Sequence, residues 1–241
     1  MTLFNTSVEA RSARAGALER GITDLAMQSL WENETTAEGS DDYMNQVTRD
    51  AAYEEVLHLV QTRGIMTALP EFQQEIEAAN VEATARGWDP SNNNSVEYFA
   101  QQFDVYFDLW AVQPTRWEGV DARPGQFPEG TAHGGQNRAN TRARLLEDDP
   151  VAYELEESFF PPYLTYTPLL PVDFAGTFSI ALDTSKRYTY KSQHLRKVTL
   201  RGDNDAQLVG NRHENVLTGN AGDNTLTGGE GDDRLNGNGG D

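Results

Sequence analysis

The chain has 241 residues, which is enough for one sizeable core with an appendage or for two small domains. Its 38 acidic residues against 19 basic ones give a formal net charge of -19, so its surface disfavours nucleic acid and anionic lipid and favours cations. No apolar run approaches membrane-spanning length and no basic segment precedes an apolar stretch at the start, which argues against a transmembrane segment and a Sec-type signal peptide.

Helical spacing of apolar residues dominates the first 160 or so positions. It predicts helices over about 7–32 with an interruption near Gly21, then over 42–63, 70–86 and 95–110, and a short one over 150–159. Between the last two lies a stretch rich in Gly, Pro and Arg, 115–141, which we expect to be a long loop that covers something.

From position 162 onward the pattern changes to strands. Alternating or β-branched runs predict strands over 163–167, 176–182, 187–190 and 197–200, which we expect to connect the helices to the last forty residues. Composition then shifts sharply, because 201–241 holds 10 of the 21 glycines and no aromatic residue.

Leucines recur every nine residues in this last segment, each after a turn rich in Gly, Asn and Asp: Leu208, Leu217, Leu226 and Leu235. The copy over 228–236 fits G-G-x-G-x-D-x-U-x at every position, and 219–227 fits with asparagine in sixth place. The copies over 210–218 and 201–209 are weaker, and a fifth begins at Gly237 and stops at Asp241.

The nine-residue spacing has a physical reason. Six residues form a tight turn, where glycine and asparagine adopt positive φ at low cost, and three form a short strand with an inward leucine. Two repeats complete one coil, so Leu208 and Leu226 should line one sheet while Leu217 and Leu235 line another. Carbonyl and carboxylate oxygens of stacked turns can then enclose Ca²⁺, whose binding would supply much of the folding free energy.

The segment therefore resembles the RTX family of calcium-binding repeat proteins over roughly the last forty residues; a flexible linker is the alternative, but linkers have no fixed leucine period. The expected calcium ligands lie in the turns: Asp233, Asn224, Asn215, Asp232, Asp223, Gly228, Gly219 and Gly210. The resemblance implies a secreted, extracellular protein exported by type I secretion machinery, with a secretion signal beyond residue 241. The chain has no cysteine and so no disulfides, which is consistent with extracellular calcium as the stabilising cross-link.

Two phrases in the helical region, Ala51-Ala-Tyr-Glu-Glu-Val-Leu-His-Leu-Val60 and Ser95-Val-Glu-Tyr-Phe-Ala, resemble the active-site region of gluzincin-type metallopeptidases, together with the stretch 140–160. Those enzymes carry H-E-x-x-H on one helix and a glutamate ligand on a later one. The resemblance implies His58 and Glu97 as zinc ligands and Glu55 as the general base, with Glu54 in place of the first histidine. Two carboxylates and one imidazole would hold a less electrophilic zinc than the usual set.

A plain solvent-facing stripe is the alternative for this helix. The polar residues fall in one arc of a helical wheel and apolar ones cover most of the rest: Glu54, Glu55, His58, Gln61 and Thr62 against Val56, Leu57, Leu59 and Val60. No metal, a degenerate metal site and an active peptidase thus all remain open. The other histidines, His133, His194 and His213, are expected to be surface residues.

Together these patterns predict an α+β chain: a mainly helical, zincin-like domain over 1–161, a β connector over 162–200 and a truncated parallel β-roll of RTX repeats over 201–241. The expected function is extracellular calcium binding, with calcium-triggered folding of the β-roll and a non-catalytic helical domain. The alternative is an exported zinc metallopeptidase with a variant E-E-x-x-H…E site. Calcium, and zinc under the alternative, are the expected cofactors.

Overall fold

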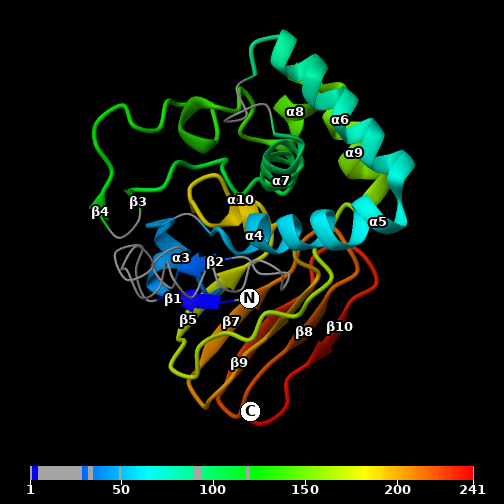
Figure 1. The fold of residues 1–241 in the computed structure, drawn as a ribbon. Coiled ribbons are helices and arrows are strands. Elements are labelled where there is room, and N and C mark those ends of the chain that lie inside the picture. Colours follow the sequence, from blue (N-terminus) through cyan, green and yellow to red (C-terminus); the bar gives the residue numbers. More distant parts are fainter. Residues whose placement is uncertain are drawn as a thin grey trace. The chain divides into compact units, whose positions relative to one another are not determined.

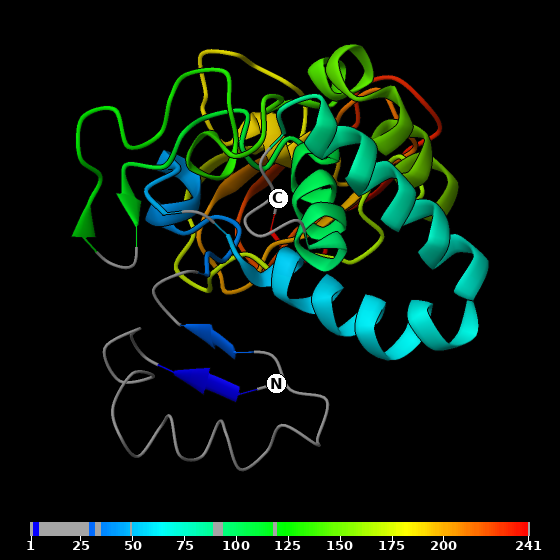
Figure 2. The same ribbon diagram turned by 45° about the horizontal axis from the view of Figure 1, so that its top comes forward.

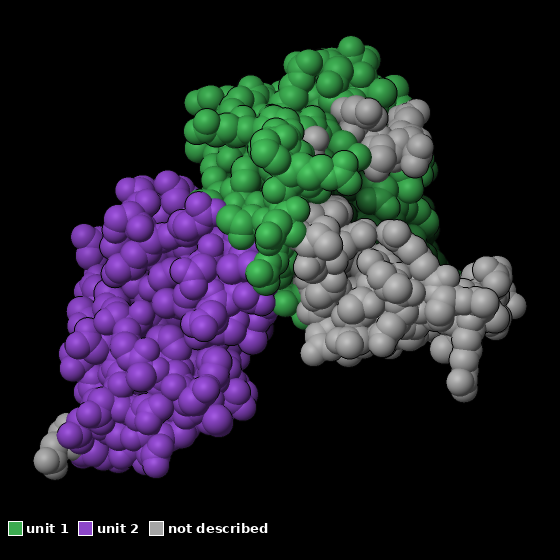
Figure 3. Space-filling model, turned by 90° about the vertical axis from the view of Figure 1, so that its left-hand side faces the viewer, with its two compact units in different colours: residues 1–35, 48–159 green, residues 36–47, 160–241 purple. Residues whose placement is uncertain are grey.

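The computed structural model describes residues 2–4, 29–31, 35–48, 50–88, 94–117 and 120–240 (Figure 1). Its contacts divide the chain into two compact units, residues 1–35 with 48–159 and residues 36–47 with 160–241 (Figure 3). We call them the helical unit and the strand unit. The chain is α+β, with helices in the first unit and parallel strands toward the C-terminus. The predicted connector and repeats belong to one unit, which residues 36–47 join.

The helical unit contains most of the helices and two short strand pairs. In chain order its elements are β1 (Thr2–Phe4), β2 (Ser29–Trp31), α4 (Ala52–Leu59), the π-helix η2 (Val60–Ile65), α5 (Met66–Ala68), α6 (Pro70–Ala85), α7 (Ser95–Tyr106), β3 (Arg116–Trp117), β4 (Val120–Asp121), the 3-10 helix η3 (His133–Gly135), α8 (Arg142–Asp148) and α9 (Pro150–Phe159). β1 pairs with β2 in parallel, and β3 pairs with β4 antiparallel.

Helix α7 is the centre of this unit. It contacts α4, α6, α8 and α9, and Figure 2 shows it beside α4 and α6. The Asn94 side chain caps it by accepting a hydrogen bond from the Val96 N–H, and every side chain from Tyr98 to Tyr106 is buried. A helix buried all round belongs to a core, so its polar residues must find partners inside the protein.

The long loop supplies some of those partners. Gln101 donates to the Gln136 side chain over 3.2 Å, and Asn137 donates to Gln102 over 3.1 Å. The loop predicted over 115–141 therefore does cover something, namely the polar part of α7. Helix α8, which follows the loop, was not predicted; Thr141 caps it by accepting from the Arg144 N–H.

Several predicted helix limits are wrong. The single helix expected over 42–63 is interrupted. Helix α3 (Asp41–Asn45) in the strand unit ends where Gln46 adopts a left-handed φ of 53°, and α4 begins at Ala52 in the helical unit and continues as η2 from Val60. Helix α7 ends at Tyr106 rather than 110, and Asp108 two residues later has a φ of 55°. Most of the helix predicted over 7–32 lies outside the described residues, and Ser29–Trp31 is a strand.

The strand unit stacks parallel strands in two sheets. Its elements are α3, β5 (Gly176–Ser179), α10 (Thr189–Ser192), β6 (Lys197–Thr199), β7 (Ala206–Val209), β8 (Val216–Thr218), β9 (Asn224–Thr227) and β10 (Arg234–Asn236). One sheet has the order β5-β7-β9 and the other β10-β8-β6, all parallel. The chain thus alternates between the sheets, and β5 with β6 makes the first coil, before the repeats begin.

The register follows the nine-residue period. Phe178 pairs with Leu208 and Leu208 with Leu226 in one sheet, while Val198 pairs with Leu217 and Leu217 with Leu235 in the other. The predicted placement of the four leucines is confirmed. Phe178 and Leu217 are fully buried, but Leu235 is 45% exposed, so apolar burial falls along the array.

Two of the predicted strands are wrong or reduced. Residues 187–190 lead into helix α10, where the buried Ser192 hydroxyl donates to the Ser179 carbonyl and Tyr188 packs on Phe178 with ring centroids 5.5 Å apart. These contacts with β5 outweigh the strand preference of alternating Tyr and Thr. In 163–167 only Leu164 pairs, through an isolated parallel bridge to Leu195.

Candidate metal sites

The polar face of α4 is buried rather than exposed to solvent. Glu54 is 5% exposed and His58 6%, whereas Val56 on the other side of the helix is 46% exposed. The solvent-facing stripe, one of the alternatives from the sequence, is therefore wrong. Buried ionisable groups need partners, and α7 lies against α4 to provide them.

The structure brings Glu54, His58 and Glu97 together. One potential ligand atom from each lies within 4.8 Å of the others, and His58 Nε2 is 3.7 Å from a Glu97 carboxylate oxygen. Glu54 and His58 are one turn apart on α4, and Glu97 comes from the first turn of α7. The predicted convergence of these three side chains is confirmed, while metal binding by them stays a prediction.

Glu55 contacts the other nitrogen of the same ring, with its Oε2 3.3 Å from His58 Nδ1. Burial alone would lower the pKa of His58, but the Glu55 hydrogen bond and the charges of Glu97 and Glu54 outweigh it, so the pKa is raised. Nε2 has no hydrogen-bond partner among the described residues. In this arrangement Glu55 orients the imidazole and leaves Nε2 directed at Glu97.

A second group shares Glu54 with the first. Glu54, Asp104 and His133 also offer ligand atoms that lie within 4.8 Å of one another, and all three residues are buried. His133 Nε2 is 3.3 Å from an Asp104 oxygen, and its Nδ1 is 4.0 Å from Glu54 Oε1.

His133 and His194 were both expected at the surface, and both expectations are wrong, because each is only 7% exposed. His133 lies in η3 of the long loop, which Gln136 and Asn137 tie to α7, and its ring packs on Trp110 with centroids 4.7 Å apart. The signal that could have found this site is the run Gln101, Gln102 and Asp104 on an otherwise apolar helix, because such residues require polar partners when buried.

In the strand unit, the side chain of the sixth residue lies against the first glycine in three of the repeat turns, 210–215, 219–224 and 228–233. A Cβ added to Gly210 or Gly219 would lie 2.4 Å from the amide oxygen of Asn215 or Asn224, and one on Gly228 would lie 2.0 Å from Asp233 Oδ2. Only glycine fits such a position. The asparagine oxygens accept from the backbone N–H of Asn211 and Asn220 within their own turns.

Asp233 differs from those asparagines because its carboxylate reaches the adjacent turn. Its Oδ1 accepts from the backbone N–H of Asn215, eighteen residues earlier, over 2.9 Å. The turns over 210–215 and 228–233 are thus stacked, and a Cβ on Gly229 would lie 2.4 Å from the Asn211 carbonyl oxygen. A carboxylate and several carbonyl oxygens meet at this junction, which is the donor set that calcium prefers.

Hydrogen bonds from side-chain amides connect the other repeat turns to the coil that precedes them. The Asn220 amide donates to the carbonyl oxygens of Arg201 and Asn204 over 3.0 Å each, and the Asn211 amide donates to those of Gln193 and Leu195 over 2.9 Å each. Both asparagines occupy the second position of the repeat, where the copy over 228–236 has Gly229. They connect consecutive coils without a cation.

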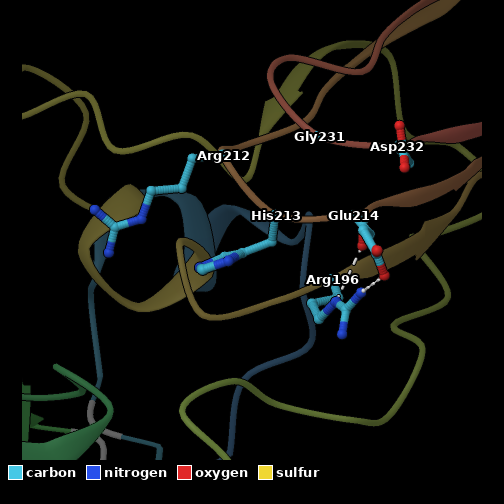
Figure 4. A pocket seen from close by; sticks show the side chains of 6 residues that line it. All are labelled: Arg196, Arg212, His213, Glu214, Gly231 and Asp232. Carbon is cyan, nitrogen blue, oxygen red and sulfur yellow. Dashed lines mark hydrogen bonds and ion pairs between the residues drawn. The ribbon is translucent and has the colours of Figure 1, made fainter.

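The fifth residue of each repeat turn is acidic, and the contacts of its carboxylate differ from one turn to the next. Asp205 accepts from the Asp223 backbone N–H over 2.9 Å, and Glu214 forms an ion pair with Arg196 over 2.9 Å. Glu214 and Asp232 line one pocket of about 450 Å³ with Arg196, Arg212, His213 and Gly231 (Figure 4). Arg196 therefore offsets part of the negative charge at this junction.

The register and turn chemistry define the class of this region as calcium-binding nonapeptide repeats. The family model of the RTX calcium-binding nonapeptide repeat, which comprises four copies, matches residues 209–241. No curated protein and no solved structure matches the chain. Among the helices in the described ranges, none is long and apolar enough to cross a membrane.

Proposed function

We propose that this is a secreted, extracellular calcium-binding protein whose C-terminal β-roll, residues 201–241, folds when calcium binds. The observation that carries the proposal is the RTX match over 209–241 on turns whose register stacks Gly210 and Asn215 on Gly228 and Asp233. Export by type I secretion machinery belongs to the same proposal, because a chain that folds only with calcium stays unfolded where calcium is scarce. The helical unit is then non-catalytic.

The calcium ligands proposed are turn carbonyls and side chains of the repeats: Gly210, Gly219, Gly228, Asn215, Asn224, Asp223, Asp232 and Asp233. Full carboxylates are the stronger calcium ligands, and the amide oxygens of Asn215 and Asn224 are already hydrogen-bonded within their turns. The junction between 210–215 and 228–233 is therefore the leading site.

Replacing Asp233 with alanine is expected to weaken calcium binding by roughly tenfold or more, and replacing Asn215 to have a smaller effect, because ligand charge sets calcium affinity. Isothermal titration with calcium measures both. Asp233→Asn is the matched control, since it keeps an oxygen acceptor for the Asn215 N–H and removes only the charge. Equal affinities for Asp233→Ala and Asn215→Ala would contradict the ligand assignment.

A second candidate function is metal binding by the helical unit, as a degenerate or active zincin-like site. The convergence of Glu54, His58 and Glu97 favours it. An active peptidase would use Glu55 as the base on a metal-bound water. Glu54 in place of histidine lowers the electrophilicity of the metal, so we propose little or no peptidase activity.

Glu54→His is expected to take up about one equivalent of zinc, because it restores two imidazoles and one carboxylate. Metal analysis after calcium chelation measures this, with Glu75→His on the exposed face of α6 as the control for adventitious binding. A stoichiometric zinc and peptide hydrolysis in the unchanged chain would establish the peptidase alternative instead. No zinc in Glu54→His would rule out a zincin-like site.

A further inference from the structure

We propose that Glu54, Asp104 and His133 form a second divalent-cation position beside the His58–Glu97 group, with the Glu54 carboxylate shared between the two. Each group brings its ligand atoms within 4.8 Å, and the two histidines belong to different groups. One ion therefore does not account for both imidazoles. A carboxylate common to both groups is suited to bridge two cations, which lie about 3.5–4 Å apart in two-metal sites.

The charge balance of the interior favours cations here. Glu54 and Asp104 are both buried, and burying carboxylates close together is unfavourable unless cations offset their charge. His58 and His133 are the imidazoles that face Glu97, Glu54 and Asp104. Two histidines carry at most two positive charges against the three carboxylates of the two groups, Glu54, Glu97 and Asp104, whereas two dications carry four.

Glu156 on α9 provides an independent observation. It is fully buried, and neither of its carboxylate oxygens has a hydrogen-bond partner among the described residues. Burial, and then the charge of Asp104, raise its pKa well above the usual value, which places it within electrostatic reach of the second group. A cation at Asp104 would offset the negative charge of Asp104 that acts on Glu156.

The structure also holds Asp104 and His133 in place before any metal binds. Trp110 Nε1 donates to Asp104 Oδ2 over 3.3 Å, and the same indole packs on the His133 ring. Such outer partners fix the orientation of metal ligands. Asp104 on α7 and His133 on the loop that covers it are thus held by Trp110, and α4 contributes the third ligand, Glu54.

The donor set defines the class of ion. Each position would have one imidazole and two carboxylates, which suits Mn²⁺ or Fe²⁺ better than the softer ions that thiolates select. This inference adds a site to the helical unit and does not depend on calcium binding by the repeats or on peptidase activity.

The test uses the full chain with excess calcium, so that the repeats are occupied, and titrates it with Mn²⁺ under metal analysis and electron paramagnetic resonance. We expect about two equivalents of Mn²⁺ with the spectrum of an exchange-coupled pair. His133→Asn, which tolerates the left-handed φ of 49° at that position, should reduce this to about one equivalent with the spectrum of an isolated ion. His58→Gln should also reduce binding to about one equivalent, because it removes the imidazole ligand of the Glu54, His58 and Glu97 position.

Controls separate this proposal from its alternatives. His213→Ala in the repeats should keep both equivalents, and circular dichroism of each variant shows whether it folds. Binding of no Mn²⁺ by the folded chain would overturn the proposal, as would a single equivalent that His133→Asn leaves unchanged. Loss of all Mn²⁺ in either histidine variant would indicate one shared ion and also overturn the second position.

Discussion

Removal of calcium is expected to unfold the repeats while the helical unit stays folded. The segment 201–241 carries eight acidic residues against three arginines, so its turns repel one another when no cation is bound. Its apolar burial is small, since Leu226 is half-buried and Leu235 is 45% exposed. We therefore expect calcium binding to contribute much of the folding free energy, at affinities of about 10⁻⁴ to 10⁻³ M, which is the range of extracellular modules.

Limited proteolysis with trypsin measures this prediction. Arg234 in β10 and Arg212 in a repeat turn should be cut rapidly with a chelator present and slowly in millimolar calcium. Arg63 in η2 is exposed in the helical unit and serves as an internal control, because its cleavage should not change with calcium. Magnesium at equal ionic strength controls for charge screening. Equal protection of 201–240 with and without calcium would contradict calcium-dependent folding.

Replacing Gly210 with alanine is expected to destabilise the repeats strongly. The added Cβ would lie 1.9 Å from the Gly228 carbonyl oxygen, a backbone atom of the next turn on the same side. The Gly210 N–H is also hydrogen-bonded to the Thr227 carbonyl at 2.7 Å, so neither backbone can move away without breaking the sheet register. We expect a loss of about 3 kcal/mol in the free energy of unfolding, at the upper end of the range for overpacking.

Gly237 provides the matched comparison. It occupies the same first position of a repeat, but an added Cβ would meet no atom within 4 Å, and its φ is not positive. Gly237→Ala should therefore change stability little. Urea unfolding followed by circular dichroism at saturating calcium measures both variants. Similar losses for Gly210→Ala and Gly237→Ala would show that close stacking of the turns does not limit these positions.

The sequence predicted the repeat region well because its contacts repeat at a fixed interval. A nine-residue period places Leu208 against Leu226 and Leu217 against Leu235 without knowledge of any other part of the chain. Helices α6 and α9 were likewise predicted close to their limits, since each has an apolar face and a proline at its first position.

The errors arose where distant residues decide the local structure. The alternating Tyr and Thr of 187–190 favour a strand, but contacts of Tyr188 and Ser192 with β5 make the segment helical. The polar arc of α4 matches a solvent-facing stripe equally well in sequence, and only the position of α7 shows that it is buried.

The candidate site was predicted only in part for the same reason. Glu54, His58 and Glu97 could be named because a local motif on two helices carries them. His133 could not, since its place depends on a loop of more than twenty residues that returns to α7 through Gln136 and Asn137. No short-range pattern encodes such a return.

The hydrogen bonds of the Asn211 and Asn220 side-chain amides indicate the direction in which the repeats fold along the array. They fasten the turns over 210–215 and 219–224 to the coil that precedes each, through hydrogen bonds that need no ion. That preceding coil includes β5 and β6, whose residues Phe178 and Val198 are buried. In a stacked array each coil contacts only its neighbours, so we expect the first coil to act as a nucleus for the repeats. We therefore expect the repeats to fold from β5 and β6 toward β10, where Gly229 has no side-chain amide and calcium is the proposed link between the turns.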